Sequence, residues 1–352
     1  MTHTDVNLEN DVDLLAHIKE GQASCAPMYQ PGPYWAHKAK AAAGELHEQG
    51  LANFRSADSS VANSFGDNPM VDISKAYSEG SKRRLAQWLF KLPVVGNVLN
   101  AQRNIAQTHF HRSTELSTLI LNRDPRVKEL LDRYNVPQSN MLGCAASSGS
   151  IHGSEISHHY LELLNTLDHV NTHIDLNTKR SLFEIGGGFG VNLHLMIENF
   201  PNLRKFIYLD IAPNLYVGTQ YLKAVYGDAV QDFRATQSRG SLTFADDDSL
   251  EILCILPHQI EHIASSTDVF YNAHSFVEMP EAVVQNYANH AKRVLAPQGD
   301  IALVSYGHFD LNSTFDPAKL GPIFDLPFEA KQVDGLLGAR NHYQFHRSKD
   351  GV

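Results

Sequence analysis

The stretch Ser181-Leu-Phe-Glu-Ile-Gly-Gly-Gly-Phe-Gly190 decides the fold of this chain. Residues 182–185 predict a short buried strand, and a helical run begins at Val191. The glycines between them can adopt positive φ and let the backbone come close to a ligand. A helix that starts after such a turn presents its free N–H groups to polar or anionic atoms. The stretch therefore predicts a strand, a tight turn and a helix, with a ligand at the turn.

The spacing of the glycines narrows the choice of ligand. A dinucleotide fingerprint needs G-x-G-x-x-G/A, and its third small residue would fall on Val191. A phosphate loop is excluded because no Gly-Lys-Ser/Thr follows. A second acid, Asp210, ends the strand-like run 206–210, at the distance of about twenty residues where a βα unit places a ribose-binding carboxylate. The alternative is a turn without ligand and a solvated acid, but glycines, strand and acid together favour a ribose-containing ligand.

From about residue 178 the chain alternates strand-like and helical patterns, which indicates an α/β, doubly wound, Rossmann-like sheet. Ligands of such sheets lie at the carboxyl ends of the strands. We expect a turn at Pro297-Gln-Gly299 and a solvated loop, rather than a metal site, at the acid run 246–248. The expected strands are 181–185, 206–210, 251–256, 268–273, 300–306 and one including 343–346, and the expected helices are 191–199, 213–226 and 280–295.

The N-terminal half predicts a mostly helical region. Helices are expected at 36–49, at 81–100 until Pro93 and Gly96 cut it short, as a pair within 113–135, and at 155–167. Residues 57–80 and 143–150 are expected to be loops. The helix at 81–100 can pack on the domain or help to form a homo-oligomer. Three residues are candidate substrate contacts: Tyr34 next to a Pro-Gly turn, and Glu155 with His158, which would share one helix face.

The composition excludes several classes of partner. The chain has 352 residues and a net charge of −10, without the basic face that nucleic-acid binding needs. No apolar run is long enough to span a membrane, and the N-terminus does not resemble a signal peptide. Three widely spaced cysteines suit a reducing cytoplasm and have no metal-ligand spacing. We expect no metal site, the cluster of His152, His158 and His159 included.

Glu184 and the G-x-G-x-G pattern that follows it resemble the first motif of class I S-adenosylmethionine (SAM) methyltransferases. The match becomes narrower in the runs 208–223, 256–261 and 272–279, which are similar to the sugar O-methyltransferase family. The resemblance covers roughly residues 180–310 and implies SAM as the cofactor. It also implies a SAM-binding domain at 176–352, with the region 1–175 as a substrate-binding or lid region.

The resemblance assigns roles to individual residues. Asp210 should hold the ribose, Ile211 should pack on the adenine, and Asn272 should reach the SAM amino group or the reaction centre. Pro257 and His258 follow a strand where the adenine edge commonly lies; in the family an aromatic residue is usual at the position of His258. The residues that should line the methionine end of SAM are Glu184, Gly186, Gly188 and Gly190.

A hydroxyl acceptor also needs a group that removes its proton. His274 is the first candidate, because it follows a strand on the side of the crevice and histidine is the commonest base near neutral pH. The family usually has a small or acidic residue at this position. Glu278 is the second candidate, either as the base or as the group that orients His274. The alternative is that both residues have structural roles, in which case Glu278 would cap the following helix.

The sequence thus predicts a SAM-dependent methyltransferase that modifies a hydroxyl of a sugar or of a glycosylated small metabolite. The alternative is an N- or O-methyltransferase for a non-sugar natural-product intermediate. A third class, a non-catalytic scaffold with the same fold, is disfavoured because Glu184, the glycines and Asp210 are all present.

Overall fold

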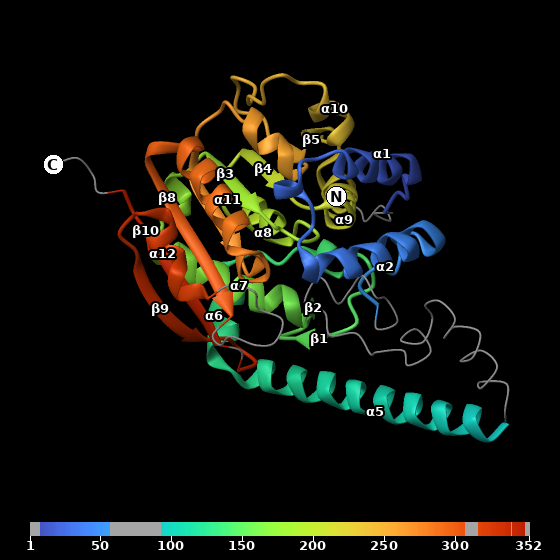
Figure 1. Cartoon of the computed structure of the whole chain (residues 1–352). Helices are drawn as coiled ribbons and strands as arrows, with labels where there is room; N and C mark the ends of the chain where they lie inside the picture. Colours follow the sequence, from blue (N-terminus) through green and yellow to red (C-terminus); the bar gives the residue numbers. More distant parts are fainter. Residues whose placement is uncertain (1–7, 57–92, 307–315, 339, 349–352) are drawn as a thin grey trace.

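An eight-stranded sheet forms the centre of the computed structural model, which describes residues 8–56, 93–306, 316–338 and 340–348 (Figure 1). β10 runs antiparallel to both of its neighbours, and every other pairing in the sheet is parallel. In spatial order the strands are β5 (Val230–Gln231), β6 (Glu251–Ile255), β4 (Lys205–Leu209), β3 (Ser181–Ile185), β7 (Thr267–Ala273), β8 (Leu295–Tyr306), β10 (Arg340–His346) and β9 (Glu329–Asp334).

The order of the parallel strands reverses at β3. From β3 the chain passes through β4 to the edge strand β5, comes back to form β6 between them, and then crosses to place β7 and β8 on the other side of β3. Such a reversal is the topological switch point, where open α/β sheets bind ligands at the carboxyl ends of their strands. β3 and β4 are buried along their whole length, as parallel strands covered on both faces should be. The predicted doubly wound α/β fold is confirmed, and its glycine turn follows the strand at the switch point.

Two hydrophobic cores lie on the two faces of the sheet, and alternate residues of each strand point into each core. Leu182 belongs to the larger core, while Phe183 belongs to the smaller one. The larger core is covered by the N-terminal helices together with α7 (His158–Asn171), α8 (Val191–Asn199) and α9 (Ala212–Tyr226). The smaller core is covered by α11 (Glu281–Val294) and α12 (Leu320–Phe324).

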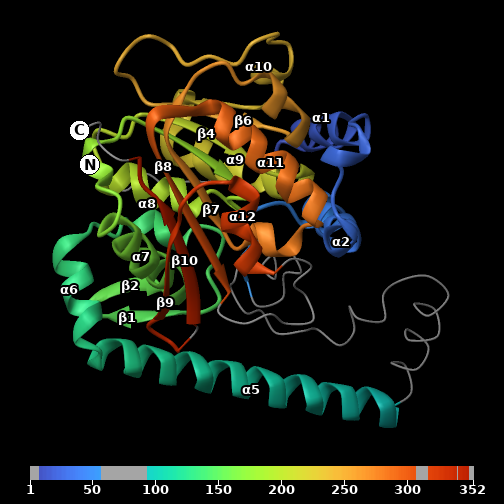
Figure 2. The same cartoon turned by 60° about the vertical axis from the view of Figure 1, so that its left-hand side comes forward.

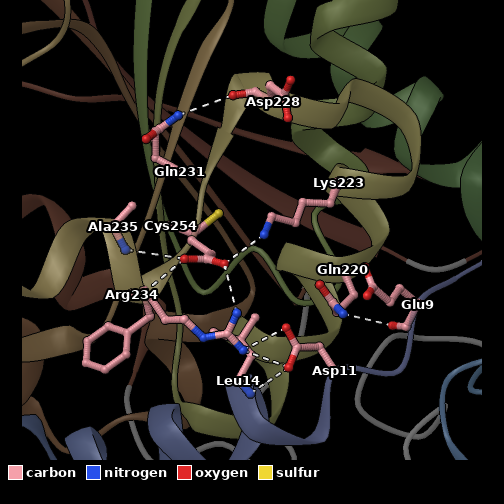
Figure 3. Close-up of polar contacts among 12 residues, drawn as sticks. Glu9, Asp11, Leu14, Gln220, Lys223, Asp228, Gln231, Arg234, Ala235 and Cys254 are labelled. Atoms are coloured by element: carbon pink, nitrogen blue, oxygen red, sulfur yellow. Dashed lines mark hydrogen bonds and ion pairs between the residues drawn. The ribbon is translucent and has the colours of Figure 1, made fainter.

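The N-terminal region is mostly helical, as predicted, but it packs directly on the sheet domain (Figures 1 and 2). Figure 3 shows one such contact, where Arg234 on α10 (Phe233–Gln237) forms a 2.7 Å ion pair with Asp11. Nearby, the amide of Gln220 on α9 donates to the carbonyl of Glu9 at 2.8 Å. The other elements of this region are α1 (Val12–Ala23), η1 (Pro27–Tyr29), α2 (Pro33–Gln49), α5 (Pro93–Arg123), α6 (Pro125–Arg133), η3 (Gln138–Met141), β1 (Ser148–Ile151), β2 (Ser154–Ser157) and η4 (Leu176–Thr178).

The helix expected over 155–167 begins only at His158. Ser157 caps it by accepting from the N–H of Tyr160, and Glu155 lies before this cap on β2. Glu155 and His158 therefore do not share a helix face, so that prediction was wrong. The loop expected over 143–150 also ends early, because its last residues form β1 of a small hairpin. The hairpin turns at Gly153, whose φ is +89°, a conformation that suits glycine.

Two proline-based predictions also need correction. Gly96 does not cut a helix short, because α5 begins at Pro93, a position where a missing N–H costs nothing, and continues through Gly96 to Arg123. Pro297-Gln-Gly299 forms no turn between elements but lies inside β8, where the pairing with β7 shifts between Thr267 and Val269. The strands β5 and β9 were not predicted. The expectations for 57–80 and for the first part of 81–100 fall outside the described residues.

The other elements expected from the sequence were placed well. The strands that became β3, β4, β6 and β7 agree within one residue, as do the helices that became α8, α9 and α11, and α6 begins at the expected break near Pro125. Along the described part of the chain, no helix is both long and apolar enough to cross a membrane.

Candidate active site

The glycine turn at the end of β3 depends on conformations that suit glycine. Gly186, Gly188 and Gly190 have φ of +72°, +63° and +84°, and Gly190 is the N-cap of α8. The N–H of Gly186 donates to the carbonyl of Leu209 at 2.8 Å, which ties the turn to the end of β4. A Cβ on Gly186 would overlap the side chain of Ser275, so another residue here needs both a strained backbone and a displaced neighbour.

Asp210 follows β4 and holds this turn through its carboxylate. Oδ2 accepts from the N–H of Gly188 at 2.8 Å, and Oδ1 accepts from the N–H of Ile211 at 2.7 Å. The side chain is only 5% exposed, and burial raises its pKa to about 7, although these hydrogen bonds oppose the shift. Oδ1 also accepts from the amide of Asn214 at 3.4 Å, whereas Oδ2 keeps a second lone pair that a ligand hydroxyl could use. Asp210 and the turn are thus brought together at the switch point.

Glu184 is fully buried beneath the turn, and half of its carboxylate has no partner. Oε1 accepts from the amide of Asn192 at 2.7 Å, whereas no hydrogen bond reaches Oε2. Burial raises the pKa of Glu184 to about 8, with a further contribution from the charge of Asp210. A buried carboxylate oxygen without a donor is costly unless a ligand supplies one. The site therefore fits a ligand that brings an ammonium group to Glu184 and ribose hydroxyls to Asp210, as SAM does.

The raised pKa of Glu184 makes a prediction for the ligand-free protein. The folded state holds this proton more tightly than the unfolded chain, so the stabilisation is complete below the ordinary value of 4.5 and is lost as the pH rises through 8. Urea unfolding between about pH 5 and pH 9 should show a falling free energy of unfolding, and a smaller decline in Glu184→Gln. The exposed Glu129→Gln variant is the control. An equal decline in wild type and Glu184→Gln would contradict this assignment.

Asn272 joins the ends of β3 and β7. Its Nδ2 donates to the carbonyl of Ile185 at 2.8 Å and to the hydroxyl of Ser275 at 2.6 Å, while its Oδ1 accepts from the N–H of Phe276 at 3.3 Å. The side chain is 1% exposed. These bonds show that the amide fixes the shape of this edge of the sheet. The role expected for it at the SAM amino group stays a prediction.

The residues expected at the adenine lie on the other side of the glycine turn. Ile211 is half-buried and precedes α9, and Pro257 and His258 begin η6 (Pro257–His262) directly after β6. His258 Nδ1 lies 2.8 Å from Cys25 Sγ, and burial lowers the pKa of the imidazole. His258 therefore contacts the N-terminal region, which the sequence did not indicate.

His274 follows β7 with a left-handed backbone. Its φ is +67°, which is uncommon for a residue other than glycine. The ring stacks on Tyr306 at the end of β8, with centroids 4.4 Å apart, and Nδ1 is buried without a hydrogen-bond partner. Burial, together with the charge of His159 on α7, lowers the pKa of His274 to about 4. The imidazole is consequently neutral near pH 7.

Glu278 ends η7 (Ser275–Glu278) and contacts the N-terminal region. Its Oε2 accepts from the indole N–H of Trp35 on α2 at 2.9 Å, and its charge contributes to the raised pKa of Asp210. Since Nδ1 of His274 has no partner, Glu278 does not orient the histidine through that atom. The two catalytic candidates thus lie on one short segment, but they face different neighbours.

The three candidate substrate residues are not gathered at this edge by any contact that we observe. His158 is 3% exposed, and its two ring nitrogens lie 3.0 Å from the hydroxyl of Thr118 and 2.9 Å from that of Ser147. Glu155 is exposed on β2. Tyr34 belongs to α2, but its side chain lies outside the described residues.

The N-terminal region contacts the segments that follow β4, β6 and β7. The side chain of Gln22 accepts from the N–H of Ala212, at the start of α9, at 3.2 Å. Tyr29 donates to Glu261 on η6 at 2.6 Å, and Trp35 donates to Glu278. These contacts join segments more than 180 residues apart, so no local pattern could reveal them.

The acid run 246–248 binds nearby cations of the chain itself: Asp247 pairs with Lys205 and Asp248 with Arg180, at 2.9 and 2.7 Å. In the parts of the chain that the structure describes, no group of three or more His, Cys, Asp or Glu side chains is placed to hold a metal ion.

No protein-family model matches the sequence, and no curated protein matches it either. Solved structures do. An O-methyltransferase family protein from Burkholderia thailandensis is 10% identical, with a TM-score of 0.40, over 54% of this chain and 58% of its own. The mitomycin 7-O-methyltransferase MmcR is 14% identical, with a TM-score of 0.38, over 75% and 71%. Human N-acetylserotonin methyltransferase in complex with SAM is 12% identical, with a TM-score of 0.34, over 54% and 56%. The chain spans less than two thirds of the length of the first and the third.

Proposed function

We propose that this chain is a SAM-dependent methyltransferase that moves a methyl group to a hydroxyl of a sugar or of a glycosylated small metabolite. The observation that carries the proposal is the contact between Asp210 and the N–H of Gly188 at the topological switch point. It places a buried carboxylate, a glycine turn and the free N–H groups of α8 at one edge of the sheet, where α/β folds bind nucleosides.

Different residues of this edge bind different parts of SAM. Asp210 accepts hydrogen bonds from the ribose hydroxyls, and the unpartnered Oε2 of Glu184 receives the ammonium group. Ile211 and His258 border the adenine. The bound cofactor supplies a methyl group on a positively charged sulfur. The protein must then exclude water and align the acceptor, and alignment alone can contribute much of the rate.

His274 is the residue that accepts the proton of the acceptor hydroxyl. Its Nδ1 is free of other hydrogen bonds and its ring is held by Tyr306, so the base is oriented before the acceptor arrives. The low pKa keeps the imidazole neutral at physiological pH. The sugar class of acceptor is supported by the similarity of residues 208–223, 256–261 and 272–279 to the sugar O-methyltransferases.

Replacing His274 with alanine should lower turnover more than tenfold while leaving the affinity for SAM unchanged, because a well-placed base contributes about 10²–10⁴-fold. In wild type, the limb of the pH–rate profile that reports this base should rise through about pH 4. His262→Ala, an exposed histidine at the end of η6, is the control. Turnover above a tenth of wild type in His274→Ala would show that His274 is not the general base. It would favour the alternative acceptor, an amine, whose methylation depends less on a general base.

The direct test of the function is transfer of a labelled methyl group from SAM to a panel of sugars, glycosides and small amines. Methyl uptake by sugars or glycosides only would support the proposal. Uptake by amines only would replace it with an N-methyltransferase. If calorimetry shows no binding of SAM or of its demethylated product, alone or with the acceptors of the panel, the proposal fails and the fold serves another purpose.

A further inference from the structure

Arg55 is the largest fully buried side chain among the described residues, and it is a cation. Among the described residues, its guanidinium donates to the carbonyls of Asn140 and Leu142, at 2.6 and 3.2 Å, and to the hydroxyl of Ser157, at 2.7 Å. Burying a cation is costly unless its donors are satisfied. A guanidinium is the suitable group, because its planar fork can bond in one plane and stack with its face.

The face of this guanidinium lies over the ring of Phe189, with 4.8 Å between Cζ and the ring centroid. That distance is within the range of a cation–π interaction. Phe189 is the only residue with a side chain within the stretch 186–190. It is 1% exposed and also packs edge-on against Phe54 and Tyr221, with centroids 5.6 and 5.0 Å away.

Glycines have no side chain with which the surrounding structure could fix them, and they have the widest choice of backbone conformation. The positions of Gly188 and Gly190 therefore depend on their hydrogen bonds and on Phe189 between them. Asp210 holds the N–H of Gly188, and the hydroxyl of Tyr208 donates to its carbonyl at 2.5 Å. These two groups act from the sheet, whereas Arg55 acts on the side that faces the N-terminal region.

We propose that Arg55 is a positioning residue that fixes the glycine turn for its ligand by clamping Phe189. The proposal rests on the proposed function, since it takes the ligand of the turn to be SAM. It gives the N-terminal region a role that its place in the chain does not suggest. The backbone of Arg55 is bonded to the same segment, because its N–H donates to Gly143 and its carbonyl accepts from Ala146 at 2.8 and 3.1 Å.

The clamp is tested from both ends. Arg55→Lys keeps the charge but loses the planar face and the fork, and Phe189→Leu keeps an apolar side chain but loses the ring. Each should weaken SAM binding about tenfold in calorimetry, and the double variant should be no weaker than either single variant, because both remove one contact. Ser157→Ala is the matched control. It removes a hydrogen bond from the same guanidinium without touching Phe189, and should lower thermal stability while leaving the affinity for SAM within twofold.

A second readout does not need the cofactor. Hydrogen exchange at the amides of Gly188 to Val191 should be faster in both variants than in wild type and unchanged in Ser157→Ala. This readout separates the failure of the proposed function from the failure of the Arg55 proposal. If the wild type binds no SAM, the proposed function fails, but the exchange rates still test whether Arg55 fixes the turn through Phe189. Loss of stability with unchanged exchange at the turn would reduce Arg55 to a structural residue, as would additive effects of the two substitutions on exchange or affinity. Because Phe189→Leu lies at the far end of the contact, it tests the clamp even if Arg55→Lys fails to fold.

Discussion

Replacing Asp210 with asparagine is expected to weaken the binding of SAM by about a hundredfold or more. The native carboxylate accepts from two backbone N–H groups, of Gly188 and Ile211. An asparagine amide presents one oxygen and one NH₂, so whichever way it turns, a donor faces one of these N–H groups. The substitution thus disturbs the turn as well as removing the acceptors for the ribose. A hydrogen bond to a charged group contributes about 1.5–3 kcal/mol, and two are at stake.

The matched control for this experiment is Asp232→Asn. Asp232 is also a buried carboxylate, 7% exposed, which caps α10 and pairs with Lys223 at 2.7 Å, but it lies after β5, at the far edge of the sheet from the switch point. This variant should lose stability and keep its affinity for SAM. Calorimetry with SAM and with its demethylated product, at a pH above 7, compares the two. Affinity within threefold of wild type in Asp210→Asn would mean that the ribose is held elsewhere.

The part of the site that the sequence could predict is the part built by local geometry. A strand, a glycine turn and a helix are specified within 181–199, and Asp210 is placed by the length of one βα unit. Because the carboxyl ends of parallel strands meet at one edge, the residues after β3, β4, β6 and β7 could be expected to converge. Their order in the sheet, with the reversal at β3, was not predicted and comes from the structure.

The rest of the site depends on contacts between distant segments. Trp35 reaches Glu278 across 243 positions and Cys25 reaches His258 across 233, and nothing in either segment alone indicates its partner. Glu155 and His158 show a different failure. Their spacing fitted a helix, but pairing with β1 holds Glu155 in a strand, and the cap at Ser157 makes His158 the first residue of the helix. Tertiary pairing there outweighs local propensity.

There are also physical reasons why two strands of the sheet, β5 and β9, were not predicted. β9 is an exposed edge strand that carries Glu329, Lys331 and Asp334, so it has no apolar alternation to reveal it. β5 has only two residues, Val230 and Gln231. The stretch Pro297-Gln-Gly299 has the composition of a turn, but the shifted pairing with β7 accommodates it inside β8. The extra residues of this bulge lie in β8, and only the pairing with β7 on both sides of them shows that the strand continues.

Replacing Gly186 with alanine is expected to destabilise the protein by about 2–5 kcal/mol and to abolish SAM binding, because backbone strain and overpacking add at this position. The φ of +72° disfavours any residue with a Cβ, and the added methyl would overlap the side chain of Ser275. Ser275 cannot move freely, since its hydroxyl accepts from Asn272, which in turn is bonded to the carbonyl of Ile185. The strain is therefore expected to spread to the ends of β3 and β7.

Two further variants separate these causes. Gly153→Ala has the same backbone problem, with φ of +89°, but no atom lies within 4 Å of its Cβ, so it should cost only the strain, about 1–3 kcal/mol. Gly186→Ala combined with Ser275→Gly removes the overlap and should recover the difference between the two alanine variants in urea unfolding. Recovery of stability without recovery of SAM binding would show that the turn itself, and not its packing on η7, holds the cofactor. If Gly186→Ala proves no more destabilising than Gly153→Ala, the close approach of Ser275 has no energetic consequence, and the tight edge at the switch point is not what fixes the turn.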